Sequence, residues 1–141
     1  TLFRSATDEV KEGPNYVQVT DNRGTEAGWS LKVKQEGQFK STSGKELTGA
    51  AITFKNGNVV TASDSGKPTG PATITLNSDG SQSDVMSAAK GNGAGTYLFD
   101  WGTDATTAAK SIELTVPGST TKYAEKYATK LTWTLTDAPG N

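Results

Sequence analysis

Apolar and polar residues alternate in short runs along most of the chain, and turn-forming residues separate these runs. WSLKVKQ at 29–35 and LTWTLT at 131–136 are clear examples. Successive side chains of a strand point to opposite faces, so this alternation is typical of strands with one buried face. No segment longer than one or two turns shows the helical period of about 3.6 residues. The pattern therefore predicts a protein built almost entirely of β-strands.

The predicted strands are separated by stretches rich in Gly, Asn, Asp, Ser and Thr, which form tight turns or adopt positive φ. Many short strands at this spacing are typical of a β-sandwich or a barrel-like fold. We expect an all-β, single-domain fold of mostly antiparallel strands with long Gly/Ser/Thr-rich loops. The predicted strands are Tyr16–Asp21, Trp29–Gln35, Glu46–Lys55, Asn58–Ala62, Ala72–Asn77, Asp84–Ala88, Thr96–Trp101, Ser111–Pro117 and Ala128–Asp137.

Two segments carry local signals of their own. In ITFKNGNVV, Asn56-Gly57 separates two apolar runs, and the type I′ turn favours this pair because both of its central residues need positive φ. A β-hairpin is therefore predicted over residues 50–61. In TKYAEKYATK, Tyr123 and Tyr127 are four residues apart. That spacing is compatible with one helical turn, but an extended approach to the last strand is favoured.

A Trp-x-Leu triplet occurs twice, in an early strand and in the last one. Alternate residues share a face, so Trp29, Leu31 and Val33 point the same way. The residues that share a face of the last strand are Tyr127, Leu131, Trp133 and Leu135. A buried Trp covers about 200 Å² and commonly anchors a small β core, and the pattern alone favours this interpretation. If the two strands are neighbours and open to solvent, these residues would instead form a strip that binds sugar rings or a protein partner. Alternation does not decide between the two.

Length and composition narrow the possible functions. A chain of 141 residues can bury most of its apolar surface as one domain without disulfides. The net charge of -1 argues against nucleic acid as a partner. The chain contains no cysteine and no histidine, which removes thiolate nucleophiles, Ser-His pairs and most zinc and haem sites. An absence of cysteine also suits a secreted bacterial protein that is built without disulfides.

The sequence predicts a soluble chain. No apolar run approaches the roughly 18 residues that span a bilayer, so no direct membrane insertion is expected. The first residues, TLFRSATDEV, lack the basic start and apolar core of a signal peptide. If the protein is exported, we therefore expect that its signal has been removed.

The remaining motifs give no catalytic, cofactor or metal site. Gly44-Lys45 lacks the spacing of a phosphate loop, and GNGAG at 91–95 is more typical of a flexible hairpin loop than of a dinucleotide site. NSDGSQSD at 77–84 offers oxygen atoms to Ca²⁺ but lacks the spacing of an EF-hand loop. Paired carboxylates could support glycoside hydrolysis, but most are expected to be solvated. The candidates are Asp100, Asp104, Glu113, Glu125 and Asp137.

Four segments resemble the WxL domain of cell-surface proteins from low-GC Gram-positive bacteria. They are YVQVTDNRGTEAGWSLKV at 16–33, ELTGAAITF at 46–54, SIELTVPGST at 111–120 and YATKLTWTLTDAP at 127–139. This family is recognised by a proximal Trp-x-Leu and a distal Tyr-x-x-x-Leu-Thr-Trp-x-Leu-x-x-x-Pro. The proximal motif falls on Trp29 and Leu31. The distal motif falls on Tyr127, Leu131, Thr132, Trp133, Leu135 and Pro139. The resemblance runs from about residue 16 to the C-terminus, and residues 1–15 are expected to be a lead-in from which a first strand is missing or trimmed.

The resemblance implies a secreted, non-catalytic domain that is held non-covalently on the cell wall. It implies peptidoglycan as a ligand and a membrane-anchored WxL-interacting protein as a second partner. We expect the region where the two Trp-x-Leu strands lie side by side to form or back the binding surface. Its expected residues are Trp29, Leu31, Leu131, Trp133 and Leu135, extended by Tyr127. If these residues are buried, they fix the scaffold and nearby turns such as DNRG do the recognising.

Arg23 of the DNRG turn precedes the proximal motif and is a further candidate. Its guanidinium could pair with Asp21 or Asp137, stack on a Trp, or bind a carboxylate of a muropeptide. A structural role is favoured. Two other functional classes stay open at this point, namely a secreted carbohydrate-binding or adhesive β-sandwich for host glycans and a purely structural stalk domain.

Overall fold

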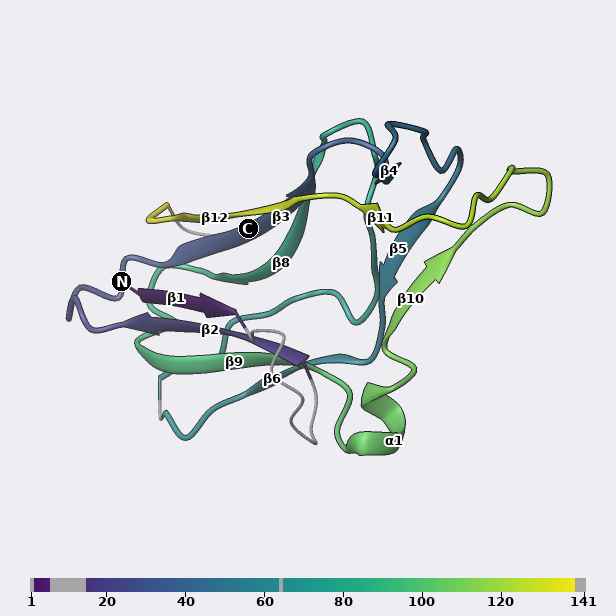
Figure 1. The fold of residues 1–141 in the computed structure, drawn as a ribbon. Helices are drawn as coiled ribbons and strands as arrows, with labels where there is room; N and C mark the ends of the chain where they lie inside the picture. The colour runs from purple at the N-terminus through teal and green to yellow at the C-terminus, as the bar shows by residue number, and fades with distance from the viewer. Residues whose placement is uncertain (1, 6–14, 64, 139–141) are drawn as a thin grey trace.

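The computed structural model describes residues 2–5, 15–63 and 65–138. These residues form short antiparallel strands and one short helix (Figure 1). The strands are β1 (Leu2–Ser5), β2 (Asn15–Asp21), β3 (Trp29–Gln35), β4 (Lys40–Ser41), β5 (Ala51–Phe54), β6 (Gly57–Val60), β7 (Ile74–Thr75), β8 (Gln82–Ala88), β9 (Gly95–Trp101), β10 (Ile112–Thr115), β11 (Tyr127–Ala128) and β12 (Leu131–Thr136), and the helix is α1 (Ala105–Ala108). The predicted all-β, sandwich-like fold is confirmed, and the strands in the described part of the chain do not close into a barrel.

Two sheets lie face to face and enclose the core. One has the strand order β1-β2-β9-β6 and the other has the order β12-β3-β8, and Figure 1 shows the second sheet above the first. Alternate residues of β2 and β9 point into the space between them, as do alternate residues of β3. The largest of these buried side chains are Trp29, Leu31, Tyr97, Phe99 and Trp101. This burial of aromatic and branched side chains is the main force that holds the two sheets together.

Strand β8 departs from simple alternation because it contains a β-bulge. Leu31 of β3 lies opposite Met86, whereas Lys32 lies opposite Asp84, so Val85 is an additional residue on the β8 side. Val85 and Met86 are consecutive, yet both are buried. A bulge places an extra residue in one strand and lets neighbouring side chains point the same way. The core thereby gains an apolar side chain that strict alternation would have exposed.

Two smaller sheets lie at one end of the sandwich. One has the order β10-β5-β7, and the other pairs β11 with β4. Figure 1 shows that the chain after β10 forms a long loop that projects from this end before it returns through β11 into β12. The predicted last strand is therefore split, because residues 127–128 pair with β4 and residues 131–136 pair with β3.

The predicted hairpin over residues 50–61 is wrong. Strand β5 pairs with β7 and β10, whereas β6 pairs with β9 in the main sheet. Asn56 has a positive φ of 57°, but Gly57 does not have the positive φ that a type I′ turn requires. A Cβ atom at Gly57 would lie 2.5 Å from Phe99. The glycine is needed for close approach to this ring, and the chain crosses from one sheet to another instead of turning back.

The remaining differences concern short elements. Strand β1 lies in the segment that was expected to be a lead-in without a strand, and it pairs with β2 along its whole length. Helix α1 lies in a segment predicted as a loop. Its start is capped by Asp104, whose Oδ1 accepts the Thr107 N–H at 2.8 Å, the usual way to satisfy a free N–H at a helix N-terminus. No helical turn forms in the described approach to β11, which bends at residues 124–125 before the strand begins at Tyr127.

Candidate attachment site

The proximal Trp-x-Leu belongs to the hydrophobic core. Strand β3 is the middle strand of its sheet, with β12 on one side and β8 on the other. Trp29 and Leu31 are each 0% exposed. The Trp29 indole N–H donates to the Gly93 carbonyl at 3.0 Å, and the ring lies 6.3 Å from that of Tyr97 between centroids. Because both residues are fully buried, the favoured interpretation as core residues is confirmed for the proximal motif, and the alternative of an exposed strip does not hold for these two residues.

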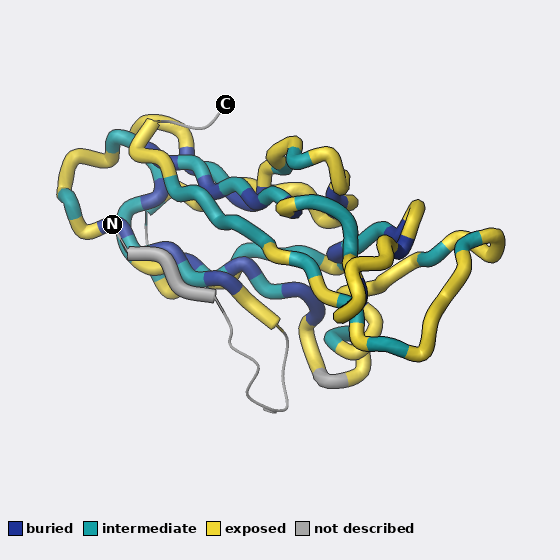
Figure 2. The backbone as a smooth tube through the Cα atoms, turned by 45° about the horizontal axis from the view of Figure 1, so that its top comes forward, coloured by how far each residue is buried: buried dark blue, intermediate teal, exposed yellow. Residues whose placement is uncertain are grey.

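The distal Trp-x-Leu lies at the edge of the same sheet. Among the described strands, β12 has a neighbour on one side only, which is β3. Leu131, Trp133 and Leu135 are half-buried and pack against the core. The Trp133 ring lies 6.2 Å from that of Trp101 between centroids. Figure 2 shows the contrast between the alternately buried β3 and the intermediate exposure along β12.

The two motif strands are neighbours, as expected, but their triplets are offset. In the antiparallel register, Leu135 lies opposite Leu31 and Trp133 lies opposite Val33. The two tryptophans are therefore not cross-strand partners, and the pair of leucines lies between them along the ladder. The half-buried side chains form one apolar row on β12 rather than a strip shared equally by two strands.

Tyr127 lies outside this row. It belongs to β11 and lies opposite Ser41 of β4. Its hydroxyl accepts the backbone N–H of Tyr123 at 2.9 Å. This bond holds the returning end of the projecting loop. The structure thus places Tyr127 in a different sheet from Trp133.

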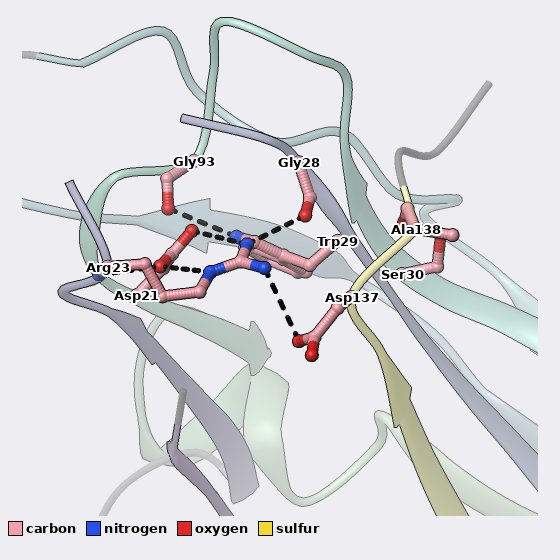
Figure 3. A network of polar contacts seen from close by, with 8 residues as sticks. All are labelled: Asp21, Arg23, Gly28, Trp29, Ser30, Gly93, Asp137 and Ala138. Carbon is pink, nitrogen blue, oxygen red and sulfur yellow. Dashed lines mark hydrogen bonds and ion pairs between the residues drawn. The ribbon is translucent and has the colours of Figure 1, made fainter. Parts of the chain in front are cut away.

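Arg23 is the centre of a polar cluster that holds the ends of the motif strands (Figure 3). Its Nε and Nη2 atoms each donate to an oxygen of the Asp21 carboxylate at 2.8 Å. Nη2 also donates to the Gly28 carbonyl at 2.8 Å, and Nη1 lies 3.5 Å from Oδ1 of Asp137. Of the alternatives considered for Arg23, the ion pair with Asp21 and the ion pair with Asp137 are both present. We call Asp21, Arg23, Gly28 and Asp137 the Arg23 clasp.

The clasp ties together three parts of the chain. Asp21 ends β2 and is 2% exposed, Gly28 immediately precedes β3, and Asp137 immediately follows β12. The hydrogen bonds from Arg23 lower the pKa of the Asp21 carboxyl, and the same carboxylate raises the pKa of Arg23. A buried carboxylate needs such a partner because its desolvation is costly. The guanidinium is therefore directed mainly at groups of this chain, which supports the structural role over recognition of a muropeptide carboxylate.

Two contacts near the motifs carry no clear signal in the sequence. Gly93, with φ of 82°, lies where a Cβ atom would approach Nε1 of Trp29 to 2.6 Å, so the glycine-rich segment 91–95 closes over the proximal tryptophan. The Ser30 hydroxyl donates to the Ala138 carbonyl at 3.3 Å. Gly93 and Trp29 are far apart in the sequence, so their contact can be recognised only from the fold.

The acidic side chains considered for hydrolysis occur on separate elements, and several of them have a partner within the chain. Glu113 pairs at 2.8 Å with Lys55, which directly follows β5, and Glu125 accepts the Ser43 hydroxyl at 3.0 Å. Hydrogen bonds lower the pKa of Asp104 and of Glu125, whereas burial raises the pKa of Asp100. Within residues 2–5, 15–63 and 65–138, no group of three or more potential metal-binding side chains gathers.

Fold and site together define an all-β sandwich in which two Trp-x-Leu strands pair within one sheet, one buried and one at the edge. The family described as "WxL domain surface cell wall-binding" matches residues 3–139 of the chain. The protein belongs to this family and is a domain of the cell surface that attaches to the cell wall. No curated protein and no solved structure matches the chain. No helix in the described part of the chain has the length and apolar character needed to cross a membrane.

Proposed function

We propose that the domain holds its protein on the Gram-positive cell surface by binding peptidoglycan non-covalently and without catalysis. The observation that carries this proposal is the match to a wall-binding family over residues 3–139. The structure adds that the two Trp-x-Leu triplets lie in one sheet, where β3 pairs with β12. The buried proximal motif builds the scaffold, so we place recognition on the half-buried β12 and on the loops around it.

A second candidate is docking to a membrane-anchored WxL-interacting protein, and the position of β12 favours it. An edge strand presents N–H and C=O groups that can pair with a strand of another protein. Leu131, Trp133 and Leu135 add half-exposed apolar side chains along that edge. Backbone pairing would supply affinity, and these side chains would supply specificity.

Co-sedimentation with peptidoglycan stripped of proteins and teichoic acids tests the first candidate. We expect the purified domain to sediment with this material and to be released by soluble peptidoglycan fragments. A domain that stays in the supernatant would contradict peptidoglycan binding and direct the search to the membrane-anchored partner. Saturation by soluble host-type oligosaccharides instead would favour an adhesive module, and a complete failure to bind would favour a stalk.

The variant Trp133→Ala tests the role of β12, with Trp133→Phe as the matched control. If β12 docks the membrane-anchored protein, the alanine variant should bind that protein at least about tenfold more weakly, a loss of about 1.4 kcal/mol, while the phenylalanine variant binds almost normally. Circular dichroism and a melting curve verify that both variants are folded. Equal binding by a folded alanine variant would remove Trp133 from the docking surface.

A further inference from the structure

Two loops border an open hollow at the end of the molecule that carries the small sheets. One loop lies between β4 and β5, and the other is the projecting loop between β10 and β11. They form a depression with a volume of about 520 Å³, within the range of about 300–1,000 Å³ that is usual for small-molecule sites. The residues that line it are Lys45, Glu46, Thr48, Ser119, Thr120, Thr121 and Tyr123. We call this depression the Tyr123 hollow.

The two walls of the Tyr123 hollow are joined to each other. The Thr120 hydroxyl donates to the Thr48 carbonyl at 2.6 Å. In the same two loops, Pro117 approaches Gly49 so closely that a Cβ atom on the glycine would lie 2.7 Å from the proline ring. The bond from the Tyr123 N–H to the Tyr127 hydroxyl holds the far end of the loop. These contacts hold the two loops in a defined arrangement, and this arrangement sets the shape of the hollow.

Its lining combines one aromatic ring with several polar groups. Tyr123 is 42% exposed, and the Lys45 ammonium lies 3.8 Å from its ring centroid. A cation over an aromatic face is attracted by the ring quadrupole, which fixes both side chains. Within the part of the chain that the structure describes, the hydroxyls of Ser119 and Thr121 and the carboxylate of Glu46 make no hydrogen bond. They are available to a ligand.

We propose that the Tyr123 hollow binds one pyranose unit of a cell-wall glycan. The ring of Tyr123 can stack on the apolar C–H face of a sugar, because aromatic rings combine a large apolar surface with a polar end. Glu46 can accept hydrogen bonds from sugar hydroxyls, and the hydroxyls of Ser119 and Thr121 can both donate and accept. Lys45 can donate to a ring substituent.

This inference deepens the proposed function and rests on it, since it assigns the glycan part of the wall as the ligand of a named surface. The hollow is separate from the Trp-x-Leu row, but Tyr127 of the distal motif connects the two regions through its bond to Tyr123. The same chemistry is offered by the glycan strand of peptidoglycan and by a secondary wall polysaccharide. The experiment must therefore include both sources.

The test is an NMR titration of the isotope-labelled chain with soluble saccharides. One arm uses disaccharides released from peptidoglycan by muramidase, and the other uses polysaccharide released from whole walls. We expect the amide signals of residues 45–48 and 119–123 to shift in at least one arm. Tyr123→Ala should weaken binding at least about tenfold, whereas Tyr123→Phe keeps the ring and binds almost normally. Tyr16→Ala removes a similarly exposed tyrosine, 38% exposed on β2, and should bind like the parent.

The outcomes separate this inference from the proposed function. If the parent and Tyr123→Ala sediment equally with peptidoglycan and bind the saccharides equally, the inference is overturned and the proposed function stands. If only the wall polysaccharide shifts residues 45–48 and 119–123, the hollow is supported as a sugar site and peptidoglycan is excluded as its source. Shifts confined to β12, or no shift in either arm, overturn the inference.

Discussion

The two Trp-x-Leu strands carry the same triplet and differ in almost everything else. In β3 the triplet lies in the middle of its sheet, and the side chains of Trp29 and Leu31 are completely buried. The Trp29 indole N–H donates to the Gly93 carbonyl. In β12 the triplet lies at the edge and is half-buried, with the Trp133 ring beside that of Trp101. The comparison teaches that burial follows the position of a strand in the sheet and not the residue pattern within it. The proximal triplet is therefore expected to determine stability, whereas the residues of the distal triplet are only partly buried.

The largest expected difference is between the two tryptophans. Trp29→Ala should reduce the free energy of unfolding by about 3–5 kcal/mol, because it leaves a cavity in the core. It also leaves the Gly93 carbonyl without its indole donor. Trp133→Ala should cost clearly less, because part of that ring is already in contact with water. Urea denaturation of the two variants measures both losses of unfolding free energy. Equal losses would contradict the difference in burial between the two tryptophans.

The two leucines give a sharper version of the same test because they face each other across the ladder. Leu31→Ala should cost roughly 2–4 kcal/mol, as is typical for a fully buried leucine. Leu135→Ala should cost about 1–2 kcal/mol, because less apolar area returns to water. The two substitutions remove the same atoms from neighbouring positions. A larger loss at Leu135 would mean that β12 is more deeply buried than the structure shows.

The difference between β3 and β12 could not be predicted from the sequence, although much of the fold could. The bounds predicted for Trp29–Gln35 are identical to those of β3, because a regular alternation of seven residues defines both the strand and its buried face. Alternation does not report how many neighbours a strand has. Whether Trp133 lies at an edge depends on pairing with a segment about a hundred residues away, which no local pattern contains.

The failed hairpin has a similar cause. Asn56 does adopt the positive φ that its residue type favours, but the path of the chain after it is set by packing of Gly57 against Phe99. The Arg23 clasp was easier to predict. Asp21 is two residues away from Arg23 in the sequence, and Asp137 directly follows a strand that was expected beside β3. The Tyr123 hollow gave no signal in the sequence, because its walls come from two loops that meet only in the fold.

The third prediction concerns acid sensitivity, through the pKa of Asp21. Because this pKa is lowered in the folded protein, the ionised carboxylate stabilises the fold above its unfolded pKa of about 3.9, and this contribution is lost as the pH falls through the lowered value. Denaturation curves of the parent should therefore show falling stability below about pH 4, and Asp21→Asn should show a smaller fall. An unchanged pH dependence in the variant would mean that the clasp does not stabilise the fold through this carboxylate.

The smallest effect is expected at the other end of the clasp. The Asp137 side chain is 74% exposed and lies 3.5 Å from the guanidinium, and exposed ion pairs contribute little to stability because water and salt screen them. Asp137→Asn should leave the denaturation midpoint unchanged within error at physiological ionic strength. A marked loss would show that the end of β12 depends on this contact more than its exposure indicates.

The pairing of β3 with β12 also affects how fast the domain folds. The Ser30 hydroxyl and the Ala138 carbonyl that meet beside this ladder are 108 residues apart in the sequence, and pairings between such distant segments slow folding. A chain synthesised from its N-terminus must therefore hold β3 without its edge neighbour until almost the whole domain is available. Stopped-flow refolding should show formation of this sheet as a late, slow phase. Late folding suits a surface protein, since the chain can be carried out of the cell before its structure is complete.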